Sequence, residues 1–320
     1  MRIFALALLL ASSLAFADFK PTKPVCIAPA KPGGGFDLTC RVVTNSLQKS
    51  KLIDQNMLVN FMPGGVGAIA YNHVISKIPK DANYVIAASV GSALNIAQGK
   101  FGSHDESAVR WIGSLGTDYG AMIVRADSKW ANLGDMLNEL KANPKAFAIG
   151  GGSSVGSQDW FKIALLVQAA GVDPKDIKYV PFEGGGEAIT ALLGGHIDLV
   201  SGDMSEYSNI ASTGKYKALA ALADERVSGE LANVPTAKEQ GYDVVWATWR
   251  GLYTGKGVSD EEYGYWVDTL KKLYDTEAFK EERASKGLWE LNITGADFEK
   301  LVKDDVARFK TLAKEQGLIK

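Results

Sequence analysis

Five glycine- or serine-rich segments are the parts of this sequence best suited to bind an anion. They come after short apolar runs and read AKPGGGFD (30–37), PGGVGA (63–68), SVGS (89–92), GGGSSVGSQDW (150–160) and FEGGGEAI (182–189). Glycine lets a backbone approach a ligand closely, and a helix N-terminus attracts negative charge through its free N–H groups. One such loop is more often a tight turn. Five in matching positions favour an anion held between two lobes.

The candidate ligand contacts are of three chemical kinds. The loops offer backbone N–H groups, the serines offer hydroxyl donors, and two cations offer full charges. The predicted set is Lys31, Gly33, Gly34, Gly35, Phe36, Asp37, Gly65, Ser89, Gly91, Ser92, Tyr119, Ser153, Ser154, Gly156, Ser157, Gly184, Asp203 and Arg250. The set contains no predicted catalytic residue and no predicted metal ligand.

Three members of this set have structural alternatives that the sequence leaves open. Lys31 is either a ligand contact or a solvated surface lysine. Arg250 either contacts the ligand or forms an ion pair between the lobes with an acid such as Asp203. Tyr119 lies either over the ligand or along the hinge.

Three charged residues beside the loops have expected roles in the fold. Asp37 can cap the helix that follows it, because a short acidic side chain accepts hydrogen bonds from free N–H groups. Arg41, one turn into that helix, is expected to pair with a local carboxylate. Glu183 would repel an anionic ligand, so we expect it to face away.

Two of the loops also match enzyme motifs, which must be weighed. GVGAIA (65–70) fits a dinucleotide fingerprint, but the next strand ends at Ser89 where an acidic residue should bind the ribose. GSSVG (152–156) fits the nucleophile elbow of a serine hydrolase around Ser154, for which His196 is the one histidine that follows. A secreted hydrolase is therefore the alternative to a binding protein.

Alternating strand and helix patterns must position these loops. Short apolar runs separated by helix-length segments indicate parallel strands buried on both faces, which is an α/β fold. The pattern predicts strands at 24–30, 57–62, 84–89, 146–151, 177–182, 197–202 and 217–223, and helices at 37–50, 66–78, 157–171 and 185–195.

Two long extended segments, 111–128 and 243–255, bracket the second strand–helix series and suggest a double crossover. This predicts lobe 1 from residues 18–122 plus 247–320 and an inserted lobe 2 from residues 123–246. A C-terminal amphipathic helix should pack back on lobe 1 through Phe298, Leu301, Val302, Phe309 and Leu312.

Residues 1–17 have the pattern of a secretory signal peptide. Arg2 precedes an uncharged apolar stretch that ends at Ala15-Phe16-Ala17, an A-x-A cleavage pattern. We expect cleavage after Ala17 and export to the periplasm. No other stretch has the roughly 18 consecutive apolar residues of a membrane span.

Composition excludes several classes of protein. The 35 Lys+Arg and 37 Asp+Glu give a net charge of −2, without the basic surplus that nucleic-acid binding needs. Two cysteines and three histidines are too few for a four-thiolate zinc site or histidine-rich metal chemistry. We therefore expect no cofactor. Cys26 and Cys40 are either two buried thiols or one disulfide, with neither favoured.

The loops and the segments around them closely resemble one family over essentially the whole mature chain. CIAPAKPGGGFDLTCR (26–41), FMPGGVGAIAYN (61–72), IGGGSSVGSQDW (149–160) and ANVPTAKEQGYDVVW (232–246) are similar to the substrate-binding subunits of tripartite tricarboxylate transporters, the TctC/Bug family. The resemblance implies a type II periplasmic-binding fold, with two α/β lobes, a two-segment hinge and a ligand cleft between the lobes. It implies no catalysis.

The resemblance also implies a ligand class and partners. The ligand would be a small carboxylate, and the partners the large and small integral-membrane subunits of the transporter, with a two-component sensor kinase as a further candidate. We expect a monomer. Lys31-Pro32 before the glycines and Trp249-Arg250-Gly251 resemble the citrate-type branch, and Lys31 and Arg250 would supply charges that a trianion needs more than a dianion.

Overall fold

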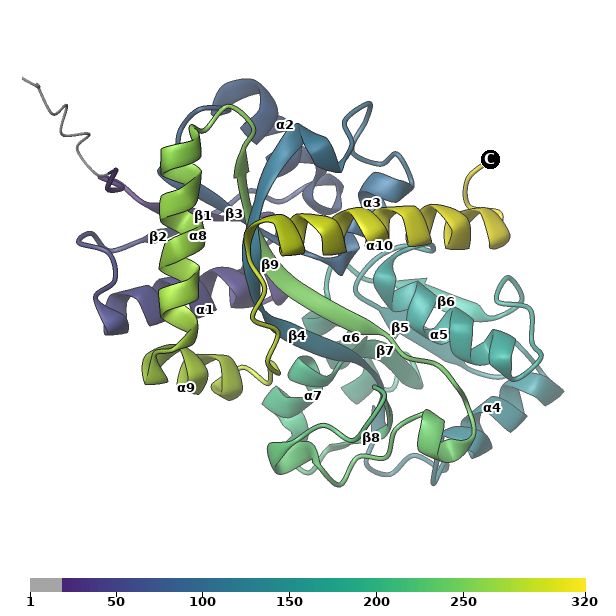
Figure 1. Cartoon of the computed structure of the whole chain (residues 1–320). Coiled ribbons are helices and arrows are strands. Elements are labelled where there is room, and N and C mark those ends of the chain that lie inside the picture. The colour runs from purple at the N-terminus through teal and green to yellow at the C-terminus, as the bar shows by residue number, and fades with distance from the viewer. Residues whose placement is uncertain (1–18) are drawn as a thin grey trace, which may run out of the picture.

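The computed structural model describes residues 19–320, which form two α/β lobes that share one long strand (Figure 1). Hydrogen-bonded strands follow the order β2-β1-β3-β9-β4-β7-β5-β6, and β8 also pairs with β4. Strands alternate with helices along the chain, so the predicted α/β class is confirmed. The predicted leader, residues 1–17, lies outside the described residues.

The first lobe is built on three parallel strands. They are β1 (Val25–Ala28), β2 (Leu58–Phe61) and β3 (Tyr84–Ser89), and β1 pairs with both others. Parallel neighbours require long crossovers, which α1 (Gly35–Ser50) and α2 (Ala68–Lys77) supply. Helix α3 (Val90–Ala97) follows β3 without a loop. The glycine-rich segments therefore come at the carboxyl ends of these strands.

Strand β4 (Val109–Arg125) connects the lobes. Its residues Val109 to Tyr119 pair antiparallel with β9 (Ala247–Gly255) in the first lobe. From Gly120 onward the same strand pairs with β7 and β8 of the second lobe. The change of partner at Gly120 agrees with a double crossover, while the lobe limits 122/123 and 246/247 stay a proposal.

The second lobe repeats the strand–helix alternation. Its strands are β5 (Ala148–Gly151), β6 (Lys178–Pro181), β7 (Leu199–Asp203) and β8 (Tyr216–Leu222), and its helices are α4 (Leu133–Ala142), α5 (Gln158–Ala169), α6 (Gly185–Leu193) and α7 (Met204–Ala211). Strand β5 pairs parallel with β6 and β7, as predicted, whereas β8 runs antiparallel to β4.

Three C-terminal helices complete the molecule: α8 (Asp260–Tyr274), α9 (Glu277–Ser285) and α10 (Gly295–Glu315). In Figure 1, α10 extends from the first lobe over to the second. Its predicted apolar face is correct, since Phe298, Val302 and Phe309 are buried and Leu301 and Leu312 are half-buried.

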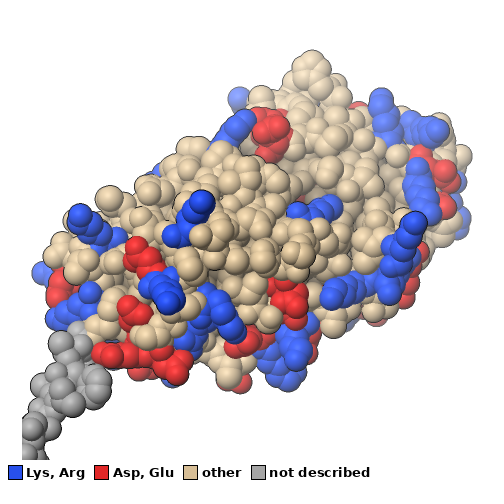
Figure 2. Space-filling model, turned by 90° about the horizontal axis from the view of Figure 1, so that it is seen from above, with Lys and Arg blue, Asp and Glu red and all other residues tan. Residues whose placement is uncertain are grey.

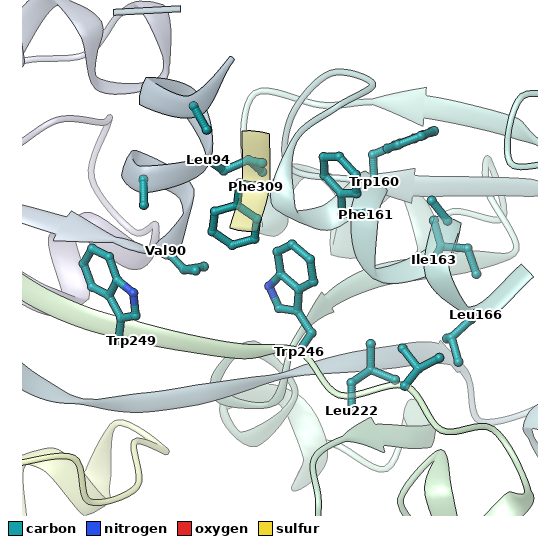
Figure 3. Close-up of a cluster of buried hydrophobic side chains, with 14 of the residues drawn as sticks. Val90, Leu94, Trp160, Phe161, Ile163, Leu166, Leu222, Trp246, Trp249 and Phe309 are labelled. Carbon is teal, nitrogen blue, oxygen red and sulfur yellow. The ribbon is translucent and has the colours of Figure 1, made fainter. Parts of the chain in front are cut away.

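The largest buried cluster continues from one lobe into the other. Trp246, where the chain re-enters the first lobe, lies between Phe161 of α5 and Phe309 of α10 (Figure 3), at ring-centroid distances of 6.1 and 5.7 Å. The apolar side chains of α3, α5 and α10 therefore form one core that joins the lobes.

Cys26 of β1 and Cys40 of α1 form a disulfide, with their Cα atoms 5.7 Å apart. The bridge spans the loop between strand and helix and so closes the first glycine-rich segment. Of the two alternatives that the sequence left open, the disulfide is the one found.

No helix within residues 19–320 is both long and apolar enough to span a membrane.

Candidate ligand-binding site

The N-terminus of α1 exposes backbone rather than side chains. Gly34 is the N-cap, and no side chain caps the helix. A Cβ added at Gly33 or Gly34 would meet no heavy atom within 4 Å. Because the first N–H groups of a helix have no intrahelical acceptor, this end has donors facing open space.

Asp37 fixes the shape of this loop. Its Oδ2 accepts a hydrogen bond from the Gly33 N–H at 2.8 Å, and its Oδ1 lies 2.8 Å from Arg41 Nε. The local ion pair predicted for Arg41 is confirmed. The Asp37 carboxylate thus holds the backbone of the glycine loop.

Helix α6 of the second lobe begins in the same manner. Its N-cap is Gly184, again without a side-chain cap, and a Cβ at Gly184 or Gly186 would meet nothing within 4 Å. A Cβ at Gly152 would lie 2.7 Å from Gly185 N, so only glycine lets the 152–157 loop pass so close to the start of α6.

An ion pair joins these two helix N-termini across the lobes. Lys31 Nζ lies 3.2 Å from Glu183 Oε2, and both side chains are exposed. Glu183, which was expected to face away from the ligand, pairs with Lys31. The pair shows that the 31–35 and 182–186 loops are neighbours in space.

Three of the predicted serine donors already serve as helix caps. Ser89 Oγ accepts from Gly91 N at 3.2 Å, and Ser92 Oγ accepts from Ser89 N at 3.3 Å. Ser157 Oγ accepts from Trp160 N at 3.4 Å. Segment 89–92 is therefore the start of α3 and not the predicted loop.

The remaining two serines lie in the 152–157 loop ahead of α5. The backbone oxygen of Ser153 accepts a hydrogen bond from the Tyr179 hydroxyl at 3.0 Å. Ser154 is exposed, and within residues 19–320 its side chain has no hydrogen-bond partner. Ser154 is the predicted hydroxyl donor most available to a ligand.

The 64–67 turn of the first lobe is strained. Val66 has φ +53°, which is unusual for a β-branched residue, and Gly65 has φ +58°. The Asn95 side chain of α3 donates to Val66 O at 3.2 Å and supports this conformation.

Arg250 lies at the centre of a buried charge network between the lobes. Its Nη2 is 3.0 Å from Asp203 Oδ2 and 3.2 Å from Asp118 Oδ2. The structure therefore has the interlobe ion pair that was the alternative for Arg250. A Cβ at Gly35 would overlap the guanidinium, so Arg250 lies directly against the first residue of α1.

The network continues into the second lobe. Lys162 Nζ lies 2.5 Å from Asp203 Oδ1 and 2.8 Å from Asp159 Oδ1. Asp159 Oδ2 accepts from Gly152 N at 2.7 Å, which ties the network to the 152–157 loop. The Ser205 N–H donates to Asp118 Oδ1 at 3.1 Å, and its hydroxyl donates to Asp118 Oδ2 at 2.5 Å.

The ionisation of these acids follows from burial and from their neighbours. Burial, reinforced by the charges of Asp203 and Asp159, raises the pKa of Glu206 to about 8. Burial and Asp203 raise the pKa of Asp118 to about 6. Burial also acts on Asp203, but Lys162 and Arg250 outweigh it and hold the pKa of Asp203 below its usual range.

Sequence reasoning missed most of this network. Asp118, Asp159, Lys162 and Glu206 were not among the predicted site residues. Lys162 carried a usable signal, because it is a lone charge within the apolar run WFKIALLV (160–167). A charge on the buried face of a helix is expected to have partners.

Tyr119 lies at the crossover between the lobes. It is the last β4 residue paired with β9, and its ring centroid is 5.6 Å from that of Trp289. Tyr119 therefore lies at the hinge region, and its role as a ligand contact stays a prediction.

Neither a hydrolase triad nor a metal centre is found in the described part of the chain. Ser154 makes no hydrogen bond to His196, which is exposed at the turn after α6. Residues 19–320 contain no group of three His, Cys, Asp or Glu side chains that could hold a metal. The face in Figure 2 is mostly uncharged in its middle, with a few scattered Lys or Arg side chains there, mixed charges along its edges and no broad basic patch.

Two α/β lobes that share a crossover strand, with glycine N-caps on α1 and α6 near the Lys31–Glu183 pair, are typical of a solute-binding protein of the periplasmic type. A family model described as the tripartite tricarboxylate transporter family receptor matches residues 39–318. The chain belongs to this family. It is a periplasmic solute-binding receptor, and neither the family nor its structural relatives are enzymes.

Individual relatives agree with this assignment. The UPF0065 protein in the gbd 5' region of Cupriavidus necator is 25% identical over 328 residues, covering 99% of this chain and 94% of the relative. A TctC solute-binding protein from Polaromonas is 27% identical with a TM-score of 0.69, covering 92% of this chain and 99% of that one.

Two further structures resemble the fold. MatC from Rhodopseudomonas palustris, with bound malate, has a TM-score of 0.79 at 20% identity, covering 90% of this chain and 98% of that one. An R. palustris protein with adipate has a TM-score of 0.82 at 18% identity, covering 93% of this chain and 98% of that one.

Proposed function

We propose that the protein captures a small polycarboxylate between the N-termini of α1 and α6 and delivers it to the membrane subunits of a tripartite tricarboxylate transporter. The observation that carries this proposal is the pairing of two bare, glycine-walled helix N-termini from opposite lobes, joined by Lys31 and Glu183. Each N-terminus suits one carboxylate, because it combines free N–H donors with a positive dipole end.

The energetics are adequate for a useful receptor. A hydrogen bond to a charged group contributes about 1.5–3 kcal/mol, and micromolar affinity needs about 8 kcal/mol. A few backbone donors on each carboxylate, together with the free hydroxyl of Ser154, would reach this after ordering costs. Malate and adipate, bound by two proteins of the same fold, each have two carboxylates that could be divided between the two helix ends.

We further propose citrate or a related tricarboxylate as the preferred ligand, with Lys31 as the selective contact. Lys31 and Glu183 are both exposed, and an exposed pair is worth only about 0–1 kcal/mol. A third ligand carboxylate could replace Glu183 at Lys31 at little cost. Arg250 is less suited to this role, because its Nη2 is engaged by two buried acids.

The remaining parts of the proposal concern export and partners. The leader at residues 1–17 would direct the protein to the periplasm, with cleavage after Ala17. The large and small integral-membrane subunits would receive the ligand from a monomeric receptor, and a two-component sensor kinase is a further candidate partner. N-terminal sequencing of the periplasmic protein should begin at Asp18; a start at Met1 would contradict the leader.

Calorimetric titration of the ligand-free protein with citrate, tricarballylate, malate, adipate and acetate tests the ligand class. We expect the di- and tricarboxylates to bind and acetate to bind weakly or not at all. Failure of every di- and tricarboxylate would refute the proposed function.

Lys31→Met tests the selective contact, with Lys20→Met as a control at another exposed lysine. Citrate should lose several-fold more affinity than malate in Lys31→Met. Equal losses for both ligands would leave the receptor assignment intact and refute only selection by Lys31.

A further inference from the structure

The 152–157 loop of the second lobe is held in place by two side chains of the first. The Gln98 Nε2 donates a hydrogen bond to Gly156 O at 2.6 Å. On the same glycine, a Cβ would lie 3.2 Å from Leu318 Cδ1 and 3.2 Å from Gln98 Oε1. Gly156 therefore fits between a side chain at the end of α3 and a side chain of the C-terminal tail. A larger residue there would be strained by φ +82° and would push both side chains aside by a few tenths of an ångström.

Gln98 acts on a peptide group that is fixed at both ends. The Ser157 N–H, in the same peptide plane as Gly156 O, donates to Ser154 O at 3.0 Å. Because a peptide is planar, holding its carbonyl from outside also holds the 154–157 turn. That turn includes Ser154 and leads into Ser157, the cap of α5.

The C-terminal tail is directed onto the second lobe by the way α10 ends. Gly317 has φ +67°, and Leu318 N donates to Ala313 O at 2.8 Å, which turns the chain back on the helix. Gln316, itself buried, donates to Gln168 Oε1 of α5 at 2.9 Å. In Figure 1 the end of α10 accordingly lies beside α5.

We propose that Gln98 and Leu318 are positioning residues for ligand binding: they hold the 152–157 loop in its binding conformation without touching the ligand. This inference rests on the proposed function for what the loop binds, but not for the contacts themselves. Since both residues belong to the first lobe and the loop to the second, the loop is fully shaped only while the lobes are together. Ligand binding and lobe approach are thereby coupled through Gly156.

The test compares Gln98→Leu and Leu318→Ala with Leu301→Ala. Leu301 is a matched control because it is a half-buried leucine like Leu318, but it lies about four turns before the end of α10, in the first-lobe part of that helix. Hydrogen exchange of residues 153–157 is measured in the ligand-free protein, and affinity is measured by calorimetry with citrate and malate.

We expect Gln98→Leu and Leu318→Ala each to speed exchange in the loop and to weaken binding about 2- to 10-fold, the effect of one net hydrogen bond or a similar packing loss. Leu301→Ala should lower the melting temperature and leave both loop exchange and affinity unchanged. Unchanged exchange in both test variants, or equal exchange in the control, would overturn the proposal. If the wild type binds neither acid, the proposed function fails, and the exchange measurements still decide whether these residues shape the loop.

Discussion

Gly34 and Gly35 are adjacent residues with different reasons to be glycine. Gly35 lies against the Arg250 guanidinium, which Asp118 and Asp203 hold in place. Gly34 faces open space with φ −92°, a conformation that any residue can adopt. In the proposed site Gly34 leaves space for a carboxylate, whereas Gly35 leaves space for the Arg250 guanidinium.

Alanine substitutions should separate these two roles. Gly35→Ala should lower the free energy of unfolding by about 1–3 kcal/mol, because the added methyl overpacks a fixed group. Gly34→Ala should change it by less than about 0.5 kcal/mol and yet weaken carboxylate binding. Urea denaturation and calorimetry on both variants measure this. A destabilised Gly34→Ala with normal affinity would contradict the assignment.

Glu206 makes stability depend on pH near neutrality. Its pKa is about 8 in the folded protein and near 4.5 when unfolded. Between these values the folded state holds a proton that the unfolded state has lost, so stability falls as pH rises from about 4.5 to about 8. Glu206→Gln should flatten this part of the profile and make the protein relatively more stable at pH 8. An unchanged slope in urea titrations from pH 5 to 8 would refute the role of Glu206.

For single residues, the sequence predicted the local ion pair of Arg41 but not most contacts between residues far apart along the chain. The Asp37–Arg41 pair lies within one helix turn, so spacing alone predicted it. The contacts of Lys162 with Asp203 and of Arg250 with Asp118 depend on where β7 and β4 place those acids, which spacing along the chain does not contain. Arg250–Asp203 was foreseen only as one of two alternatives.

Among the helices at the site, α3 and α5 have serine caps, whereas α1 and α6 begin at bare glycines. The capped helices use their serines for their own N–H groups. In the proposed function, the uncapped pair leaves its donors to the ligand. The proposal thus divides these helix ends into those that stabilise the fold and those that bind.

Substituting two serines of the 152–157 loop tests whether capping and ligand binding are carried by different residues. Ser157→Ala removes the α5 cap and should cost about 1 kcal/mol of stability. Ser154→Ala should leave stability unchanged and weaken carboxylate binding by about 1–3 kcal/mol. Thermal denaturation and calorimetry would distinguish the two, and the reverse pattern would show that the cap has been misassigned.

The disulfide closes the loop that carries the first glycines. For a loop of this size, with the cysteines 14 residues apart, the chain-entropy model gives about 3 kcal/mol. The Cys26→Ala/Cys40→Ala variant should therefore unfold at a clearly lower urea concentration than the oxidised protein. Reductant should shift the wild type toward the variant and leave the variant unaffected. Identical midpoints would show that the bridge adds no stability.

Most strands and long helices were predictable because their apolar patterns are local. Helix α3 was not, since its N-cap and first turn are the SVGS segment, which has the composition of a loop. A capping box of Ser89 and Ser92 makes that segment the helix start. The predicted extended segment 243–255 begins as a strand only at Ala247.

For the whole molecule, the balance of interlobe contacts decides whether the lobes open. The exposed Lys31–Glu183 pair is too weak to keep the two lobes closed. The apolar core around Trp246 and the end of α10, by contrast, is continuous from one lobe to the other and keeps them joined there. We therefore expect movement about the crossovers near residues 119–125 and 244–250. Small-angle scattering should show a smaller radius of gyration with saturating ligand; an equal radius would count against closure.

The two-lobed plan was predictable from five loops in two matching series, because parallel strands place such loops at one edge. The continuity of the core was not, since it depends on α10 reaching the second lobe. The predicted amphipathic face of α10 described its packing on the first lobe only.

The position of Trp246 should make movement of the lobes visible in tryptophan fluorescence. Its indole lies between a ring of α5 and a ring of α10, nearly parallel to Phe161 at 10° and tilted by 31° to Phe309. A small rotation of one lobe would change the surroundings of this indole and so its emission. The chain therefore contains its own fluorophore at the joint, and a variant that keeps Trp246 while other tryptophans are replaced by phenylalanine could report ligand capture without a label.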